Sequence, residues 1–254
     1  MGTGDGRPVV EVRGVWKGFD RKPVLRGIDV TLPPGVTLAV MGGSGTGKTV
    51  LLRIIDGLLP PDRGTVSLLG TRIERLREEQ ILPLRRRAGF VFQGAALFDS
   101  LSVFENVAFP LREHTRMSLG EITDRVHHFL ALVGMPETDE LLPGELSGGM
   151  RRRVGIARAL VTDPEVVFFD EPTAGLDPTN ARLVAELIAD LRTGISTAIV
   201  VTHDLEFAGM VADQMAILHG GRFVEVGTPA EIHASSTPVV RRFLAGDLRE
   251  DVPE

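Results

Sequence analysis

The sequence predicts an α/β fold built on a mostly parallel sheet, and three observations support this prediction. Short runs of β-branched residues alternate with helical patterns along the 254-residue chain, which is typical of βαβ units. Three of these runs, 36–41, 166–169 and 197–201, are almost continuously apolar, as expected of strands covered on both faces. The stretch 94–162 is instead mainly helical, which predicts a helical subdomain inserted in the α/β core.

Other short segments indicate antiparallel structure at the edges of the fold. The segments 9–13, 64–69 and 214–226 have the length and composition of edge strands and hairpins. The tail, 233–254, carries one short apolar stretch, VVRRFL, and ends in charged residues. We therefore expect one domain over residues 1–254, with a short C-terminal tail.

Helix starts are well marked in the sequence. A Ser or Thr followed three residues later by Glu predicts a reciprocal capping box, and Pro suits the first helical position. Asp followed by Pro gives one further start of this kind. The predicted helix starts are Ser102–Glu105, Ser118–Glu121, Thr228–Glu231 and Asp177–Pro178.

The composition excludes several classes of function. Cysteine is absent, so disulfides, thiol catalysis and zinc–thiolate sites are excluded. The net charge of −6 argues against bulk binding of nucleic acid, which normally needs a concentrated basic surface. No apolar run approaches the ~18 residues that suggest a membrane span, and the first residues lack the features of a signal peptide. The composition is compatible with a cytoplasmic protein.

A glycine-rich loop stands between the apolar run VTLAVM and a helical run, and it fits the pattern G-x-x-x-x-G-K-[ST]. Glycines let the backbone N–H groups face phosphate oxygens, and the start of the following helix adds partial positive charge. The lysine of the pattern would reach the β- and γ-phosphates, and its final hydroxyl would bind Mg²⁺. The predicted phosphate loop comprises Gly42, Gly43, Ser44, Gly45, Thr46, Gly47, Lys48 and Thr49.

Two acids end the apolar run VVFF, and a histidine follows the run TAIVVT. Asp170 stands where it could hold Mg²⁺ through water or through Thr49. Glu171, one residue further, could polarise an attacking water as a general base. Open α/β sheets bind ligands at the carboxyl ends of their strands, which is where His203 is also expected.

A second anion site is predicted at the motif LSGGM. Ser147, Gly148 and Gly149 begin a helical stretch, so a hydroxyl, bare N–H groups and the helix dipole coincide. Because the chain already has one phosphate loop, this second site is best used on a nucleotide that another copy holds.

Two arginine triplets, 85–87 and 151–153, interrupt the acidic composition. For the first triplet we expect a solvated face with nearby carboxylates. Cations in the first turn of a helix oppose its dipole, so we hypothesise that bound nucleotide supplies negative charge near the second. The alternative is that the second triplet pairs with Glu145.

Taken in their order along the chain, these motifs resemble the ATP-binding subunits of ABC (ATP-binding cassette) transporters, over about residues 9–232. The loop at 42–49 is similar to Walker A, VVFFDE to Walker B, and LSGGM to the LSGGQ signature. The resemblance implies a P-loop NTPase fold with a RecA-like core, an antiparallel β subdomain and an inserted helical subdomain. It further implies a Q-loop Gln93 that contacts Mg²⁺ and nucleotide, a D-loop Asp177, a switch His203 and an adenine-stacking Phe19.

The same resemblance implies an ATPase that works as a head-to-tail homodimer, with two ATP molecules between the copies and an integral membrane permease as partner. Such a subunit lies on the inner face of the cell membrane. Two positions depart from the family pattern. Met150 replaces the usual glutamine of the signature, and phenylalanine replaces the commoner tyrosine under adenine. Neither change removes a phosphate contact or the stacking ring face.

The stretch FQGAALFDSLSVFENVAFPLREHT, 92–115, is similar to ATPases of Mla- and MCE-type lipid transport systems. Within it Phe104, Val107, Ala108 and Leu111 have the spacing of a helix face that packs in the core. Phe98 and the loop 94–101 are the better candidates for contact with a membrane subunit.

The resemblance to lipid transporters also suggests further partners, an MCE-domain substrate-binding protein and a STAS-domain regulator. The tail, which in that group often docks on a neighbouring subunit, is short here, and this puts a swapped tail in doubt. Transport of another substrate, such as amino acids or lipoproteins, and a non-transport ABC ATPase remain as alternatives.

Overall fold

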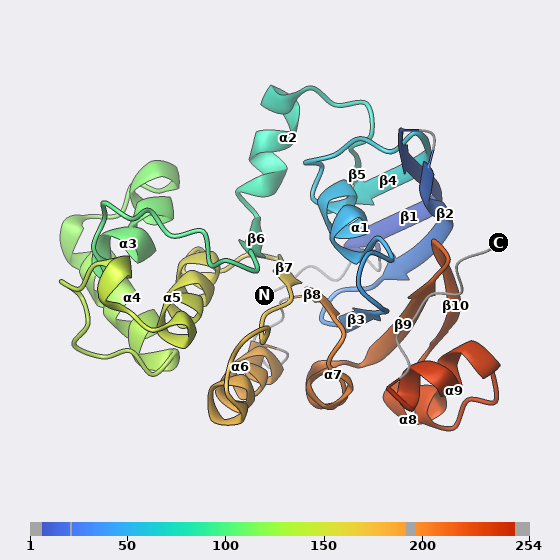
Figure 1. Ribbon diagram of the computed structural model, residues 1–254. Coiled ribbons are helices and arrows are strands. Elements are labelled where there is room, and N and C mark those ends of the chain that lie inside the picture. Colours follow the sequence, from blue (N-terminus) through green and yellow to red (C-terminus); the bar gives the residue numbers. More distant parts are fainter. Residues whose placement is uncertain (1–6, 21, 192–196, 247–254) are drawn as a thin grey trace.

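The computed structural model describes residues 7–20, 22–191 and 197–246 (Figure 1). Two sheets form the α/β part, one of four strands in the order β2-β1-β4-β5 and one of six in the order β10-β9-β3-β8-β7-β6. The helices α3, α4 and α5 lie together at one side of the six-stranded sheet, on the left in Figure 1, away from the four-stranded sheet.

The strands of the two sheets have the following bounds. They are β1 (Val10–Phe19), β2 (Lys22–Leu32), β3 (Thr37–Met41), β4 (Arg63–Leu68), β5 (Thr71–Arg72), β6 (Ala88–Val91), β7 (Val166–Asp170), β8 (Thr197–Thr202), β9 (Gln214–His219) and β10 (Arg222–Gly227).

Helices connect these strands and cover the larger sheet. They are α1 (Lys48–Ile55), α2 (Glu78–Arg85), α3 (Val103–His114), α4 (Leu119–Leu132), α5 (Gly148–Leu160), α6 (Pro178–Leu191), α7 (Leu205–Val211), α8 (Pro229–His233) and α9 (Pro238–Leu244), with a short 3₁₀ turn at Pro143–Glu145.

The three apolar runs of the sequence are the strands β3, β7 and β8, as predicted. Each is buried at every position, and β3 and β7 pair with β8 in parallel. The strand β7 continues one residue further than expected and ends at Asp170, the first of the two acids; Glu171 follows the strand. The predicted antiparallel pairing is confirmed, because β1 and β4 are antiparallel neighbours and 214–226 forms the antiparallel hairpin β9–β10. The predicted edge position is wrong for β1 and β4, which lie inside the four-stranded sheet between β2 and β5.

The predicted helix starts are present in the structure. The side-chain oxygens of Ser102, Ser118 and Thr228 each accept a hydrogen bond from the N–H of the glutamate three residues later. The carboxylate of that glutamate in turn accepts a hydrogen bond from the backbone N–H of the Ser or Thr. Such a reciprocal box satisfies two N–H groups that a helix start otherwise leaves unpaired. Asp177 accepts bonds from the N–H groups of Thr179 and Asn180, at 3.1 Å each, and begins α6.

Within the described residues, three apolar cores hold the elements together. One joins the four-stranded sheet and α1 to one face of the six-stranded sheet, and a second joins α3, α4 and α5 to its other face through residues such as Val91 and Phe169. The third core packs Ile232, Val240 and Phe243 of the C-terminal helices against β3 and β9 of the same chain. The apolar stretch of the tail is therefore the buried face of α9.

The stretch 92–115 divides as expected into a core face and an exposed face. Val107, Ala108 and Leu111 of α3 are buried, and Phe104 is partly buried against the same core. Phe98, in the loop before α3, keeps 44% of its surface exposed. Among the residues that the structure describes, no helix is long and apolar enough to cross a bilayer.

Asp56, at the end of α1, is a buried carboxyl whose ionisation opposes folding. It is 5% exposed, and burial raises its pKa to about 7, although the nearby Arg85 guanidinium lowers the pKa in part. In the unfolded chain the pKa is near 3.8, so the folded chain binds the extra proton between pH 4 and pH 7. Stability therefore falls as the pH rises through this window, and the loss is complete above pH 7.

Replacing Asp56 by Asn removes this charge. We expect the free energy of unfolding of the variant, relative to that of the parent, to be about 2 kcal/mol higher at pH 8 than at pH 5. Urea unfolding at the two pH values measures the difference. Asp99→Asn, at an exposed carboxylate, is the matched control and should show no such pH-dependent gain. An equal gain of the Asp56 variant at both pH values would contradict the expectation.

Candidate functional site

A pocket of about 490 Å³ opens at the carboxyl ends of the parallel strands. It lies where β3, β7 and β8 end, the edge at which open α/β sheets bind ligands. The loops after β3, β6, β7 and β8 and one end of the β1–β2 hairpin contribute to it. Its lining residues are Phe19, Val24, Ser44, Gly45, Gly47, Lys48, Thr49, Val50, Gln93, Glu171 and His203.

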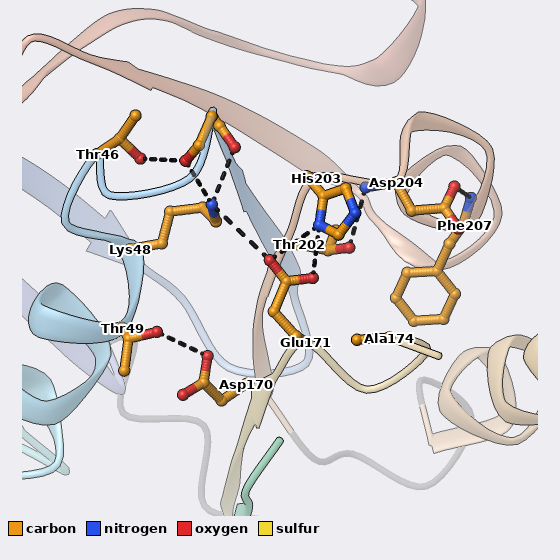
Figure 2. A network of polar contacts seen from close by, with 12 residues as sticks. Thr46, Lys48, Thr49, Asp170, Glu171, Ala174, Thr202, His203, Asp204 and Phe207 are labelled. Atoms are coloured by element: carbon orange, nitrogen blue, oxygen red, sulfur yellow. Dashed lines mark hydrogen bonds and ion pairs between the residues drawn. The ribbon is translucent and has the colours of Figure 1, made fainter. Parts of the chain in front are cut away.

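The glycine-rich loop is shaped by its own hydrogen bonds. Lys48 Nζ donates to the carbonyl oxygens of Gly42 and Gly43, both at 2.9 Å, and Thr46 Oγ1 donates to Gly43 at 3.0 Å. Lys48 is 7% exposed, and burial lowers its pKa while the charges of Glu171 and Asp170 raise it in part. The loop thus presents a buried ammonium at the base of the pocket (Figure 2).

Two glycines of this loop have no room for a side chain. A Cβ on Gly42 would lie 2.4 Å from the carbonyl oxygen of Leu218, and one on Gly47 would lie 2.8 Å from a methyl group of Val24. Gly47 also has φ 103°, a left-handed conformation that other residues rarely adopt. The turn before α1 therefore requires glycine for both space and conformation.

Asp170 and Thr49 form the oxygen pair that the sequence predicts. Thr49 Oγ1 donates to Asp170 Oδ1 at 2.9 Å, across the gap between α1 and β7. Burial raises the pKa of the Asp170 carboxyl, and the hydrogen bond from Thr49 lowers it in part. A hydroxyl and a carboxylate are the hard oxygen ligands that Mg²⁺ prefers, so the donor set fits this ion.

Glu171 stands between a cation and an imidazole (Figure 2). Its carboxylate lies 3.8 Å from Lys48 Nζ and 3.0 Å from His203 Nδ1. The backbone of Glu171 is left-handed, with φ 47°, which turns its side chain out of the strand direction. The contact with His203 joins the ends of two neighbouring strands, and motif reading alone did not identify it.

Gln93 and Phe19, which are far apart in the sequence, also line the pocket. Gln93 follows β6, and Phe19 ends β1 with 46% of its surface exposed. An exposed phenylalanine ring that lines a pocket can stack on a planar ligand. Lys17 Nζ lies 5.6 Å from the centre of this ring. Val24, which also lines the pocket, was missed because its apolar type carries no chemical signal.

The signature residues lie apart from this pocket. Ser147 caps α5 by accepting from the N–H of Met150 at 3.2 Å, and Gly148 and Gly149 form the first turn of that helix. A Cβ on Gly149 would meet Asn180 at 3.4 Å, so the motif borders the start of α6, where Asp177 is the cap. Neither the signature residues nor Asp177 line the pocket.

Two members of the first arginine triplet, Arg85 and Arg87, have the acidic neighbours that we expected, but the face is not fully solvated, because the Arg85 side chain is only 18% exposed. Arg85 pairs with Glu78, and Arg87 pairs with Glu165 at 2.5 Å.

The alternative offered for the second triplet is wrong. Arg151, Arg152 and Arg153 donate to backbone carbonyls rather than to Glu145. The carboxylate of Glu145 instead accepts from the N–H of Leu142, at 2.7 Å.

Residues 25–174, more than half of the chain, match the family described as ABC transporter. The chain belongs to this family. Its fold agrees, because this ABC ATPase domain superposes on a solved dimeric ATP-binding cassette, MJ0796, in a post-hydrolysis state bound to ADP and Pi. The TM-score is 0.81, with 30% identity over 87% of this chain and 98% of that one.

Two curated relatives are similar over almost the whole of this ABC ATPase domain. A Mycobacterium tuberculosis protein, the probable ribonucleotide transport ATP-binding protein mkl, is 41% identical over 93% of this chain and 66% of its own length. The Escherichia coli intermembrane phospholipid transport system ATP-binding protein MlaF is 37% identical over 96% of this chain and 91% of its own length. This chain thus spans about two thirds of the mycobacterial relative.

Proposed function

We propose that this chain binds and hydrolyses ATP as the motor subunit of a lipid transporter, and that two copies complete each other's sites. One observation carries the proposal. A single chain brings its glycine-rich loop and Glu171 together in one pocket, with Asp170 hydrogen-bonded to the lining residue Thr49, yet leaves Ser147 outside it. A second copy, placed head to tail, would bring its own Ser147 to the open side of the nucleotide.

The pocket offers a place for each part of ATP. Phe19 stacks on the adenine, the N–H groups from Gly42 to Thr49 face the phosphates, and Lys48 neutralises the β- and γ-phosphates. Thr49, Asp170 and Gln93 would hold Mg²⁺, which supplies positive charge against the phosphate oxygens when bound. The glycines at positions 42 and 47 let this loop pack closely against Leu218 and Val24, which sets its path around the ligand.

Glu171 is placed to act as the general base. A carboxylate at the pocket edge can accept the proton of a water that attacks the γ-phosphate. His203, at 3.0 Å, orients that carboxylate and can contact the γ-phosphate from the same edge. Lys48, at 3.8 Å, has no other carboxylate so close in the described residues and exchanges this one for phosphate when ATP binds.

The partner copy contributes a second anion site. Ser147 Oγ, the N–H groups of Gly148 and Gly149, and the start of α5 form a polar surface at the border of α6. Asp177, at the start of α6, lies next to this surface and would contact the other copy across the interface. ATP held between two such half-sites joins the copies, and its hydrolysis releases them.

A groove beside Gln93 is the proposed docking surface for the membrane permease. It measures about 430 Å³ and is lined by apolar residues of β6, the loop 94–101 and α3, including the half-exposed Phe98 and Phe109. These two rings lie 4.9 Å apart. The titratable residues of its described lining are all basic: Arg85, Arg86, His114 and Arg158. A permease helix with apolar and acidic residues fits this surface.

The cargo is proposed to be a phospholipid or a related lipid, since MlaF is similar over 91% of its own length. An MCE-domain protein and a STAS-domain regulator are the further partners that this assignment suggests. The chain would then lie on the cytoplasmic face of the membrane, held there by the permease. The name of the mycobacterial relative favours a second candidate cargo, ribonucleotides.

Purifying the complex from native membranes through a tag on this chain tests the proposal. We expect an integral membrane permease and an enriched lipid, together with ATP hydrolysis by the complex. Phe98→Glu should abolish recovery of the permease because it places a negative charge in the apolar groove. Leu119→Glu, at an exposed leucine of α4 outside the groove, is the matched control and should retain the permease.

Three outcomes would contradict parts of this proposal. A complex without enriched lipid whose ATPase rate rises with ribonucleotides would favour the second cargo. Equal loss of the permease in both variants would remove the groove as the docking surface. Absence of ATP hydrolysis in the intact complex would overturn the motor function itself.

A further inference from the structure

One buried guanidinium, that of Arg152, joins the helix that carries the signature residues to two loops of the nucleotide pocket. Arg152 lies in the second turn of α5 and is 8% exposed. Its Nη1 donates to the carbonyl oxygens of Glu171 and Ala174, both at 2.9 Å, and its Nη2 donates to the carbonyl of Gln93. The side chain thus binds the main chain of both proposed catalytic loops.

Glu171 is a residue whose backbone needs such support. Its left-handed conformation costs a residue with a Cβ about 1–2 kcal/mol. The N–H of Glu171 donates to Val201 in β8 at 2.9 Å, and its carbonyl accepts from Arg152 and, at 3.2 Å, from the N–H of Ala174. The backbone conformation of Glu171 is set by the peptide groups before and after it. The N–H of the group before it is bound by Val201, and the carbonyl of the group after it is bound by Arg152.

Packing alone does not account for an arginine at this place. Burial lowers the pKa of the Arg152 guanidinium, with the charge of Glu171 acting against this, and Nε has no hydrogen-bond partner among the described residues. A buried cation is costly unless its hydrogen bonds repay the lost hydration. The three carbonyl acceptors belong to two separate segments, and the planar fork of arginine reaches them from two nitrogens, whereas lysine has a single ammonium nitrogen.

We propose that Arg152 is a positioning residue for hydrolysis, because it fixes the positions of Glu171 and Gln93 relative to α5. Since Ser147 caps α5, the position of the proposed general base in one copy then depends on the position of Ser147 in the same copy. This inference rests on the proposed function, in which Ser147 contacts the nucleotide of the partner copy. Ser147 and Arg152 lie on one rigid helix, so a shift of Ser147 at the partner's site is transmitted to Glu171 in its own pocket. Two hydrolysis sites would then be coupled through one side chain.

The test compares Arg152→Gln and Arg152→Lys with the same changes at Arg153 in the intact transporter complex. Arg153 is the matched control, since it follows in the same helix turn and also donates to two carbonyls, those of Val133 and Gly134, outside the pocket. We expect Arg152→Gln to lower kcat about 10- to 100-fold with little change in KM for ATP. Arg152→Lys should recover part of this loss, and both Arg153 variants should keep the parent kcat.

A second measurement separates positioning from general loss of stability. Amide hydrogen exchange should rise in the segment 171–177 of the Arg152 variants and stay at the parent level in α3 and α4. Parent-like kcat together with parent-like exchange in that segment would overturn the inference, as would an equal loss of kcat in the Arg153 variants. If the parent complex itself does not hydrolyse ATP, the proposed function fails, and exchange in 171–177 alone then decides whether Arg152 holds the loop.

Discussion

Replacing Glu171 by Gln is expected to reduce ATP turnover about 100- to 10,000-fold, the range that loss of a general base produces. The amide keeps the size of the carboxylate and can still contact His203, but it cannot accept the proton of the attacking water. Binding of ATP should survive, because Lys48 and the glycine-rich loop are unchanged. The variant should therefore accumulate as an ATP-bound dimer.

Phosphate release and light scattering in the presence of ATP and Mg²⁺ measure the two parts of this expectation. Glu186→Gln, at an exposed glutamate of α6 that pairs with Arg182, is the matched control and should turn over and dissociate like the parent. If the Glu171 variant hydrolyses ATP at the parent rate, the general base is another residue. If it stays monomeric with ATP bound, nucleotide does not join the copies.

Replacing Ser147 by Arg should reduce ATP hydrolysis about 100-fold, the effect of losing one preorganised hydrogen-bond donor at a charged transition state. The new side chain also fills the surface that should meet the partner's nucleotide. The pocket of the same chain is untouched, because Ser147 does not line it. Nucleotide affinity of the isolated chain, measured by fluorescence of an ATP analogue, is therefore expected to equal that of the parent.

Ser118→Arg provides the control for this change. Ser118 caps α4 with the same geometry as Ser147 caps α5, so both variants lose one helix cap, worth about 1 kcal/mol. Only the Ser147 variant should lose hydrolysis. A parallel fall in nucleotide affinity and in hydrolysis would show that Ser147 serves its own chain, and a fall in both variants would trace the loss to the cap.

Much of the fold could be predicted because its signals are local. An apolar run of five or six residues predicts a strand buried on both faces, and a Ser–Glu pair three residues apart predicts a helix start. The glycine-rich loop was equally readable, since the steric limits at Gly42 and Gly47 leave no other residue type. In each case the residues that determine the structure are neighbours in the sequence.

Features that depend on distant segments escaped prediction. The contact between Glu171 and His203 needs β7 and β8 side by side, which no motif states. The acceptors of Arg152 are main-chain carbonyls, which every residue possesses, so no residue type in the sequence indicates them. Glu145 was offered as its partner, but that carboxylate is already used to cap a 3₁₀ turn.

The hydrogen bonds from Lys48 and Thr46 to the carbonyls of Gly42 and Gly43 have a consequence for the speed of the cycle. A cradle that keeps its shape through internal bonds loses little chain entropy when its ligand arrives. ATP entry should accordingly approach the rate of diffusional encounter, and the slow stages should lie in the meeting and parting of whole subunits.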